Sequence, residues 1–273
     1  MSYRMLEAIA KFRAKLDAGR VCLGAGITLG DPLVTDALGD SVDFFWVDNE
    51  HCLMSAESLN GHLLAARAHG VPAIVRLPGS SVEAIKPVLD SGAEGIIVPQ
   101  VRSAQEVRDV VGNCRYPPLG RRGYGPRIPS NYGRDGGAEY IARANRDLFV
   151  SVQVENAEAF GALDEIVSVP GLDSVVLGPW DLAASLGHPN EPEHPEVAAA
   201  LKTIIEKARG AGLYVGSGMG ADPDYACLMA KRGVQWLQLG GDYDYIISQV
   251  GQITAQVRSR LGATGSDVPA EQR

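Results

Sequence analysis

Short apolar runs recur along the chain and alternate with longer amphipathic segments. Eight runs have the length and near-continuous hydrophobicity of buried parallel strands. We expect strands over Val21–Ile27, Phe44–Asn49, Ala73–Leu77, Gly95–Val101, Leu148–Glu155, Ser174–Pro179, Tyr214–Met219 and Trp236–Gly240. Helical periodicity predicts helices over Ala56–His69, Val82–Ser91, Ser103–Asn113, Ala157–Ser168 and Val197–Ala211. Eight strand–helix units favour a closed (β/α)8 TIM barrel over an open doubly wound sheet, because no G-x-G-x-x-G motif follows the first run.

The two ends of the chain and one internal segment depart from this alternation. Residues 1–20 predict an amphipathic helix, and residues 262–273 are small and polar, as in a disordered tail. We therefore expect a single barrel domain over residues 1–261. The segment Arg115–Arg146 is crowded with Gly, Pro and Arg and is too irregular for a barrel helix. Its 115–134 loop could be an active-site lid, in its own or a neighbouring subunit, or a subunit-packing loop.

Composition narrows the class of protein. The chain has 273 residues, 45% of them apolar, and a net charge of −8, which argues against a nucleic-acid partner. It contains no continuous apolar run of membrane-spanning length and no signal peptide, so we expect no membrane partner. The four cysteines form no C-x-x-C pair, which favours a reducing cytoplasm.

Two carboxylates close neighbouring apolar runs of the predicted barrel. Glu155 follows Leu148–Val154, and Asp181 follows Ser174–Pro179 after Trp180. The ends of adjacent parallel strands meet at one face of a barrel, so both side chains should reach a single divalent cation. Carboxylate oxygens suit Mg²⁺, Mn²⁺ or Co²⁺ better than a structural zinc cage.

The second and third strands end in further polar groups. Asp48 lies three residues before His51, and could accept the imidazole N–H and raise its basicity. A simpler role for His51 is a hydrogen bond to the backbone. Arg76 stands among apolar residues at the barrel rim and must meet an anion, either a substrate or a protein carboxylate such as Asp90.

Other polar positions are less informative. No lysine ends a strand, which excludes Schiff-base chemistry in the pocket and leaves a metal as the Lewis acid. The lysines fall in predicted helices, at Lys11, Lys15, Lys86, Lys202, Lys207 and Lys231. We expect His62 and His69 on a helix surface and His188 and His194 in a loop. The glycine-rich turns 216–220 and 240–242 could bind phosphate or simply form tight turns.

These motifs, taken in order, resemble the class II pyruvate aldolases of the HpcH/HpaI family. The matching stretches cover almost the whole chain. They are VDNEH (47–51), VRLP (75–78), LDSGAEGIIVPQV (89–101), RYPPLGRRGYG (115–125), QVENAEA (153–159) and PGLDSVVLGPWDLAASLG (170–187). Members of that family split 4-hydroxy-2-oxo acids into pyruvate and an aldehyde.

The resemblance implies a role for each matching residue. Glu155 and Asp181 would hold the metal, and His51 paired with Asp48 would act as acid and base. Arg76 would stabilise the enolate oxygen of pyruvate. The substrate would lie against Gln153, Gly178, Trp180 and Asp181. The resemblance also implies a C-terminal helix, roughly Tyr243–Leu261, swapped between subunits of a homohexamer.

The chain departs from the family pattern at Asn49, Cys52 and Trp180, which we expect to face the aldehyde half of the substrate. The same superfamily contains oxaloacetate decarboxylases, whose reaction also passes through a pyruvate enolate, and CoA-ester lyases. A metabolite-binding barrel without catalysis is an alternative from another class. The intact set of Asp48, His51, Arg76, Glu155 and Asp181 favours an enzyme.

Overall fold

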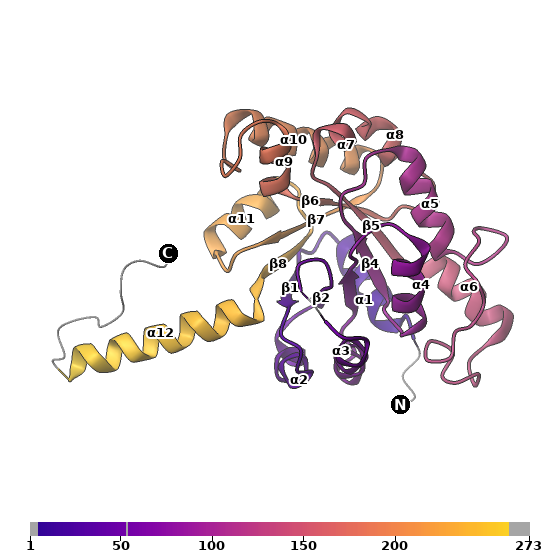
Figure 1. Cartoon of the computed structure of the whole chain (residues 1–273), viewed down its shortest axis with the longest axis horizontal. Coiled ribbons are helices and arrows are strands. Elements are labelled where there is room, and N and C mark those ends of the chain that lie inside the picture. The colour runs from indigo at the N-terminus through magenta and orange to yellow at the C-terminus, as the bar shows by residue number, and fades with distance from the viewer. Residues whose placement is uncertain (1–4, 53, 262–273) are drawn as a thin grey trace.

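Eight parallel strands close into a barrel in the computed structural model, which describes residues 5–52 and 54–261 (Figure 1). The strands follow one another around the barrel in chain order, and β1 pairs with both β2 and β8. They are β1 (Cys22–Ile27), β2 (Phe44–Asp48), β3 (Ala73–Arg76), β4 (Gly95–Val98), β5 (Phe149–Val154), β6 (Ser174–Leu177), β7 (Tyr214–Met219) and β8 (Trp236–Gly241). The predicted TIM barrel is confirmed.

Helices connect successive strands and cover the outside of the barrel (Figure 1). They are α1 (Glu7–Asp17), α2 (Leu33–Leu38) with the 3₁₀ turn η1 (Gly39–Ser41), α3 (Ala56–His69), α4 (Val82–Asp90), α5 (Ala104–Cys114), α6 (Gly137–Asp147), α7 (Ala157–Gly161), α8 (Leu163–Val167), α9 (Pro179–Ser185), α10 (Pro195–Gly210), α11 (Pro223–Lys231) and α12 (Asp242–Arg260). Ser55 and Ser103 cap α3 and α5, because each hydroxyl accepts a backbone N–H of the first turn.

The N-terminal helix closes one end of the barrel. Phe12 of α1 packs its ring 5.5 Å from the rings of Phe44 and Phe149 and 6.2 Å from that of Trp236, measured between centroids. These three aromatic residues are the first residues of β2, β5 and β8. The helix therefore seals the N-terminal ends of the strands with apolar side chains. The opposite, C-terminal ends of the strands form the open mouth, where barrel enzymes carry their active sites.

Two expectations for the helices were wrong. Only residues 115–136 of the irregular segment form a loop, because α6 (Gly137–Asp147) follows it and buries Tyr140 and Ala144. The glycines and arginines of this segment made its amphipathic helical pattern hard to recognise in the sequence. The single helix expected over Ala157–Ser168 is two short helices, interrupted at Ala162.

The histidine expected at the surface of α3 is also placed differently. His62 is fully buried, and its Nδ1 lies 2.8 Å from the hydroxyl oxygen of Thr35. Burial lowers the pKa of His62 from its usual value. His69, at the end of the same helix, contacts the carboxylates of Asp36 and Asp40 through its two ring nitrogens. Both histidines are structural and lie outside the mouth.

The last helix projects away from the barrel instead of packing along it (Figure 1). Only Asp242 of α12 is buried, whereas its apolar side chains are exposed, up to 69% for Ile247. They follow helical spacing and form one stripe, which consists of Tyr243, Ile246, Ile247, Val250, Ile253, Val257 and Leu261. The tail expected to be disordered, residues 262–273, lies outside the described residues. Within the described part of the chain, no helix has the length and apolarity needed to cross a membrane.

Candidate active site

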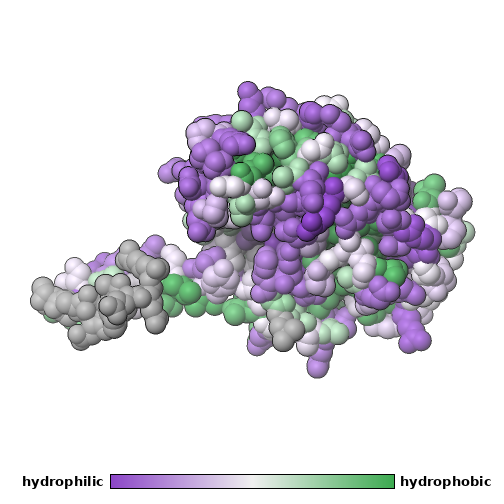
Figure 2. All heavy atoms as spheres, turned by 45° about the horizontal axis from the view of Figure 1, so that its top comes forward, coloured by the Kyte–Doolittle hydropathy of each residue, from purple (hydrophilic) through white to green (hydrophobic). Residues whose placement is uncertain are grey.

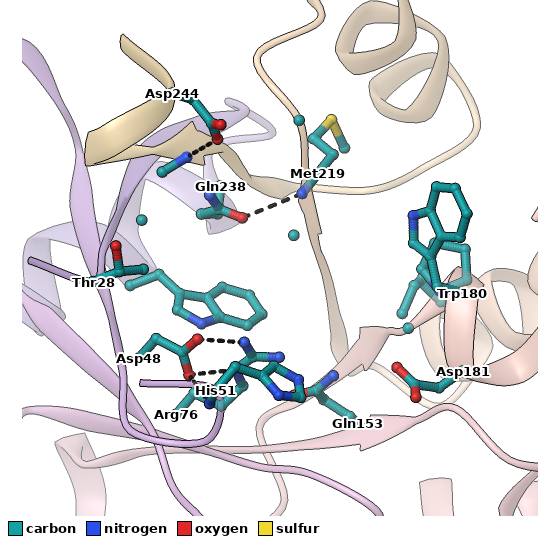
Figure 3. A pocket seen from close by; sticks show the side chains of 18 of the residues that line it. Thr28, Asp48, His51, Arg76, Gln153, Trp180, Asp181, Met219, Gln238 and Asp244 are labelled. Atoms are coloured by element: carbon teal, nitrogen blue, oxygen red, sulfur yellow. Dashed lines mark hydrogen bonds and ion pairs between the residues drawn. The ribbon is translucent and has the colours of Figure 1, made fainter. Parts of the chain in front are cut away.

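The C-terminal ends of the strands and the loops after them surround a cavity of about 430 Å³ (Figure 3). The residues expected to touch substrate or to catalyse all line it, and they are Asp48, His51, Arg76, Gln153, Gly178, Trp180 and Asp181. Glu155 lines a second hollow, which shares Asp181 with the first. The structure thus brings together side chains from four strand ends that are far apart in the sequence.

Glu155 is the buried carboxylate of the site. It directly follows β5 and is 2% exposed. One carboxylate oxygen accepts the backbone N–H of Gln100 at 2.7 Å, and the other accepts the side-chain N–H of Gln153 at 2.6 Å. The pKa of Glu155 is raised to about 7, chiefly by burial and also by the negative charges of Asp181 and Glu50, against the opposing hydrogen bond from Gln100.

Gly178 leaves the space that Glu155 occupies. It joins the end of β6 to α9. A Cβ atom at this position would lie 2.4 Å from Oε2 of Glu155 and 2.6 Å from its Cβ. No side chain fits there, so the glycine is required by the close approach of the carboxylate. Contact of Gly178 with the substrate stays a prediction.

Asp181 and Trp180 lie in the first turn of α9, which Pro179 begins. The side chain of Asp181 is exposed and faces the cavity across from Arg76 and Gln153 (Figure 3). Trp180 is 61% exposed and stands at the rim. One carboxylate is thus buried in the wall and the other is exposed at the mouth.

The donor set around Glu155 fits a divalent cation. Three carboxylates, those of Glu50, Glu155 and Asp181, act on one another electrostatically, and Arg76 is the positive charge that opposes them. The side-chain oxygen of Gln153 is buried and has no hydrogen-bond partner among the described residues. Hard oxygen donors and a surplus of negative charge are what Mg²⁺ or Mn²⁺ would satisfy.

Arg76 meets carboxylates of its own subunit. Its Nε and Nη2 donate to the two oxygens of Asp48 at 2.9 and 2.6 Å, and Nη1 lies 3.0 Å from Glu50. The guanidinium also lies over the ring of Trp46, 5.5 Å from the centroid. Arginine has five N–H donors, so two remain for a substrate oxygen. The alternative partner was wrong, because Asp90 instead pairs with Arg122 at 2.8 Å.

The expected contact between Asp48 and the imidazole of His51 is also wrong. Asp48 accepts the backbone N–H of Glu50 at 2.9 Å and that of His51 at 3.5 Å, and its remaining capacity serves Arg76. The hydrogen bonds to Arg76 hold the pKa of Asp48 below its usual value, although burial opposes them. The carboxylate nearest the His51 ring is Glu50, 3.5 Å from Nε2. The ring is 66% exposed and projects towards the cavity (Figure 3).

Several lining residues were not singled out from the sequence. Trp46 underlies Arg76, and Thr28, Gln238 and Asp244 form the side of the cavity opposite Asp181 (Figure 3). Trp46 shares the inward parity of Asp48 in β2, and Gln238 is a polar residue inside an apolar run. These two signals were present in the strands, whereas Thr28 directly follows β1 and Asp244 lies in the first turn of α12, where no strand periodicity marks a lining residue.

The 115–134 loop does not reach this cavity from its own chain, since none of its residues lines it. It packs near the N-terminal ends of the strands instead. Arg115 donates to the backbone oxygen of Leu148 at 2.9 Å and to Asp173 at 3.2 Å. A lid role within the same subunit is thereby excluded. Cys52, beside His51, has its pKa raised to about 11 by burial and by Asp48, so it remains a thiol.

Comparison with known proteins identifies the family of the chain. The family model described as HpcH/HpaI aldolase/citrate lyase matches residues 31–248. The chain is 32% identical to a hydroxypyruvate/pyruvate aldolase of Pseudomonas aeruginosa, over 92% of this chain and 93% of that protein. It is 35% identical to the 2-keto-3-deoxy-L-rhamnonate aldolase of Escherichia coli K12, with 85% and 86% covered.

A solved structure shows the same fold. The HpcH/HpaI aldolase from Desulfitobacterium hafniense superposes with a TM-score of 0.85 at 29% identity, covering 96% of this chain and 98% of that chain. Sequence and fold agree over nearly the full length of the barrel. The chain therefore belongs to the HpcH/HpaI aldolase/citrate lyase family.

Proposed function

We propose that this chain is a divalent-metal-dependent carbon–carbon lyase that splits 4-hydroxy-2-oxo acids into pyruvate and an aldehyde and catalyses the reverse addition. The observation that carries the proposal is the meeting of Glu155, Asp181, Gln153 and Arg76 at the mouth of the barrel, with His51 beside them. Relatives named hydroxypyruvate/pyruvate aldolase and 2-keto-3-deoxy-L-rhamnonate aldolase support the same reaction class.

Glu155 and Asp181 would hold the cation, and Gln153 would present its free oxygen beside them. When bound, Mg²⁺, Mn²⁺ or Co²⁺ would draw electron density from the keto and carboxylate oxygens of pyruvate. The buried Glu155 fixes the position of the site, because two donors hold its oxygens. Asp181 on α9 can adjust to the ion and to the incoming substrate.

His51 would take the proton of the C4 hydroxyl as C4 becomes a carbonyl and the C3–C4 bond breaks. The electron pair of that bond then passes into the C2–C3 double bond and onto the C2 oxygen as an enolate. Two N–H groups of Arg76 that Asp48 and Glu50 leave free would stabilise this developing charge. A proton delivered to C3 completes pyruvate. Asp48 acts here by holding Arg76.

We further propose a homo-oligomer, a hexamer as in the family resemblance, and a cytoplasmic location. The apolar stripe of α12 supports the oligomer, since it is exposed along a helix that leaves its own barrel. An extended helix of this kind can dock on another copy of the chain. Light scattering at micromolar concentration tests the assembly, and a stable monomer would contradict it.

Exchange of the pyruvate methyl protons in D₂O tests the enzyme assignment directly. We expect the proton NMR signal of the methyl group to decay with enzyme and Mn²⁺ or Mg²⁺, and to persist after exhaustive chelation. A panel of 4-hydroxy-2-oxo acids and oxaloacetate then separates aldol cleavage from decarboxylation, the strongest alternative. A metabolite-binding barrel would show no exchange, and full activity without metal would reject the proposed site.

A further inference from the structure

The cavity has two chemically different sides (Figure 3). Arg76, Gln153 and Asp181 form the side that would bind pyruvate. The opposite side, which we call the acceptor wall, consists of Thr28, Met219, Gln238, Gly241 and Asp244. Because pyruvate would occupy the first side, the aldehyde half of the substrate would lie against the acceptor wall.

Three backbone N–H donors of the acceptor wall are already used. Met219 N–H donates to the side-chain oxygen of Gln238 at 3.2 Å, and Gly241 N–H donates to Oδ2 of Asp244 at 2.8 Å. Thr28 N–H donates to the buried Asp242 at 3.0 Å. Glycine-rich turns bind anions through such N–H groups, and here the protein fills them with its own oxygens. These three N–H groups are therefore not available to a phosphate or carboxylate.

Most of the side-chain groups that remain on the acceptor wall accept hydrogen bonds. Oδ1 of Asp244 forms no hydrogen bond within the described part of the chain. Thr28 gives its hydroxyl proton to Asp242 at 2.7 Å, so its oxygen is left with lone pairs. The amide oxygen of Gln238 accepts Met219 N–H and one of its two N–H groups donates to the backbone oxygen of Gly240, so one N–H remains. Towards Asp244 and Thr28, a ligand would have to supply the proton.

The charged groups around the cavity also disfavour an aldehyde that carries a carboxylate. Arg76 is the one lysine or arginine among the described residues that line the cavity, and Asp48 and Glu50 already pair with it. Asp244 adds a negative charge on the acceptor wall. A terminal carboxylate on the aldehyde would meet this charge without a cation to balance it, which is an effective way to exclude a competing substrate.

We infer that the acceptor wall selects uncharged, hydroxylated aldehydes and rejects those that end in a carboxylate, with Asp244 as the specificity-determining residue. This inference rests on the proposed aldolase function. A hydroxyl of the aldehyde donates to Oδ1 of Asp244 or to the oxygen of Thr28. A site that hydrogen-bonds a substrate hydroxyl discriminates strongly against analogues that lack it.

The test compares three aldehydes as partners of pyruvate, with kcat/KM expressed per unhydrated aldehyde. D-glyceraldehyde carries hydroxyls, propionaldehyde has the same carbon number without them, and succinic semialdehyde carries a carboxylate. We expect kcat/KM for D-glyceraldehyde to exceed that for each of the other two aldehydes by about tenfold or more. The loss of one hydrogen bond or the presence of one unbalanced charge has an effect of about this size. Equal or better use of succinic semialdehyde overturns the inference.

Asp244→Asn isolates the charge. Asparagine keeps an oxygen that can accept Gly241 N–H, so the turn can remain intact, but the repulsion is removed. We expect kcat/KM for succinic semialdehyde to rise about tenfold, so that the ratio of kcat/KM for D-glyceraldehyde to that for succinic semialdehyde falls. Asp222→Asn is the matched control, because Asp222 also accepts backbone N–H groups at the start of a helix, α11, and does not line the cavity. An unchanged ratio of kcat/KM between D-glyceraldehyde and succinic semialdehyde in the Asp244 variant overturns its role.

Pyruvate methyl exchange distinguishes a failure of this inference from a failure of the proposed aldolase function. Exchange by the wild-type enzyme together with a preference for succinic semialdehyde rejects this inference and leaves the aldolase assignment standing. No exchange and no addition to any aldehyde rejects the aldolase assignment, and this inference with it. Normal exchange in Asp244→Asn shows that the pyruvate side is intact, so that a changed aldehyde preference reports on the acceptor wall alone.

Discussion

Gly178→Ala tests whether the position of Glu155 controls metal binding. The added methyl group would lie 2.4 Å from Oε2 and 2.6 Å from Cβ of Glu155. Rotation of the Glu155 side chain can relieve the first contact but not the second, because Cβ is fixed by the backbone. The segment that follows β6 must therefore move away from the end of β5, and the carboxylate must move with respect to α9.

The size of the effect follows from these distances. Carbon atoms in contact lie about 3.5–4.0 Å apart, so the groups must separate by roughly 1 Å. Metal sites tolerate errors of about 0.2 Å in ligand distance, and a displacement of about 1 Å in an active site costs on the order of 100-fold. We expect Gly178→Ala to weaken Mn²⁺ binding about 100-fold. Overpacking should also lower the free energy of unfolding by about 1–3 kcal/mol.

Calorimetric titration of the metal-free protein with Mn²⁺ measures the affinity, and urea unfolding measures the stability. Gly161→Ala is the matched control. Gly161 ends α7, and a Cβ atom there would have no neighbour within 4 Å, so this variant should bind Mn²⁺ like the wild type. Wild-type Mn²⁺ affinity in a folded Gly178→Ala protein would refute the assignment of Glu155 as a ligand.

Three further predictions concern the same site. In the metal-free protein, the pKa of Glu155 is raised by burial from 4.5 to about 7, so the native state retains its proton over a range where the unfolded chain releases it. Stability should therefore fall as pH rises between these values, by at most about 3 kcal/mol, and Glu155→Gln should remove this slope in urea titrations. His51→Ala should slow aldol cleavage about 10²–10⁴-fold, and wild-type cleavage by this variant would place the base elsewhere. Arg76→Ala should abolish pyruvate methyl exchange, whereas Trp180→Ala at the rim should preserve it and alter aldehyde preference. Persistent exchange in the Arg76 variant would contradict its electrostatic role.

The barrel could be predicted from the sequence because its signals are local. Each strand is an apolar run, and each helix begins or ends with residues such as Ser55, Ser103 and Gly70 whose chemistry acts within one turn. The neighbouring positions of Glu155 and Asp181 followed in the same way, since consecutive parallel strands pair in the barrel. Parity within β5 also placed Gln153 on the side of Glu155.

The pairing of charged groups could not be predicted in this way. Asp48 has His51 three residues away and Arg76 on the next strand, and the sequence favoured the nearer partner. In the barrel, β2 and β3 pair with Asp48 directly beside Arg76, so the guanidinium fork reaches both carboxylate oxygens. Two such hydrogen bonds at a buried site outweigh one to an exposed imidazole. The error lay in ranking partners by separation along the chain.

The two halves of the site differ in how their positions are fixed. The pyruvate half is built on strand ends, where Asp48 and Glu155 are buried, Arg76 is half-buried, and each is held by two or more polar contacts. The acceptor wall is built on the residues after β1 at Thr28 and on the first turn of α12 at Asp244. Its polar groups mostly form hydrogen bonds with one another or with nearby backbone groups. Substitutions in the pyruvate half disturb a metal site and an ion pair together, so they should strongly lower the activity. Substitutions in the wall can change which proton donors and charges are tolerated while the barrel and the enolate chemistry persist. With this division, the barrel can retain one carbon–carbon bond reaction while substitutions in the acceptor wall change which aldehyde it accepts.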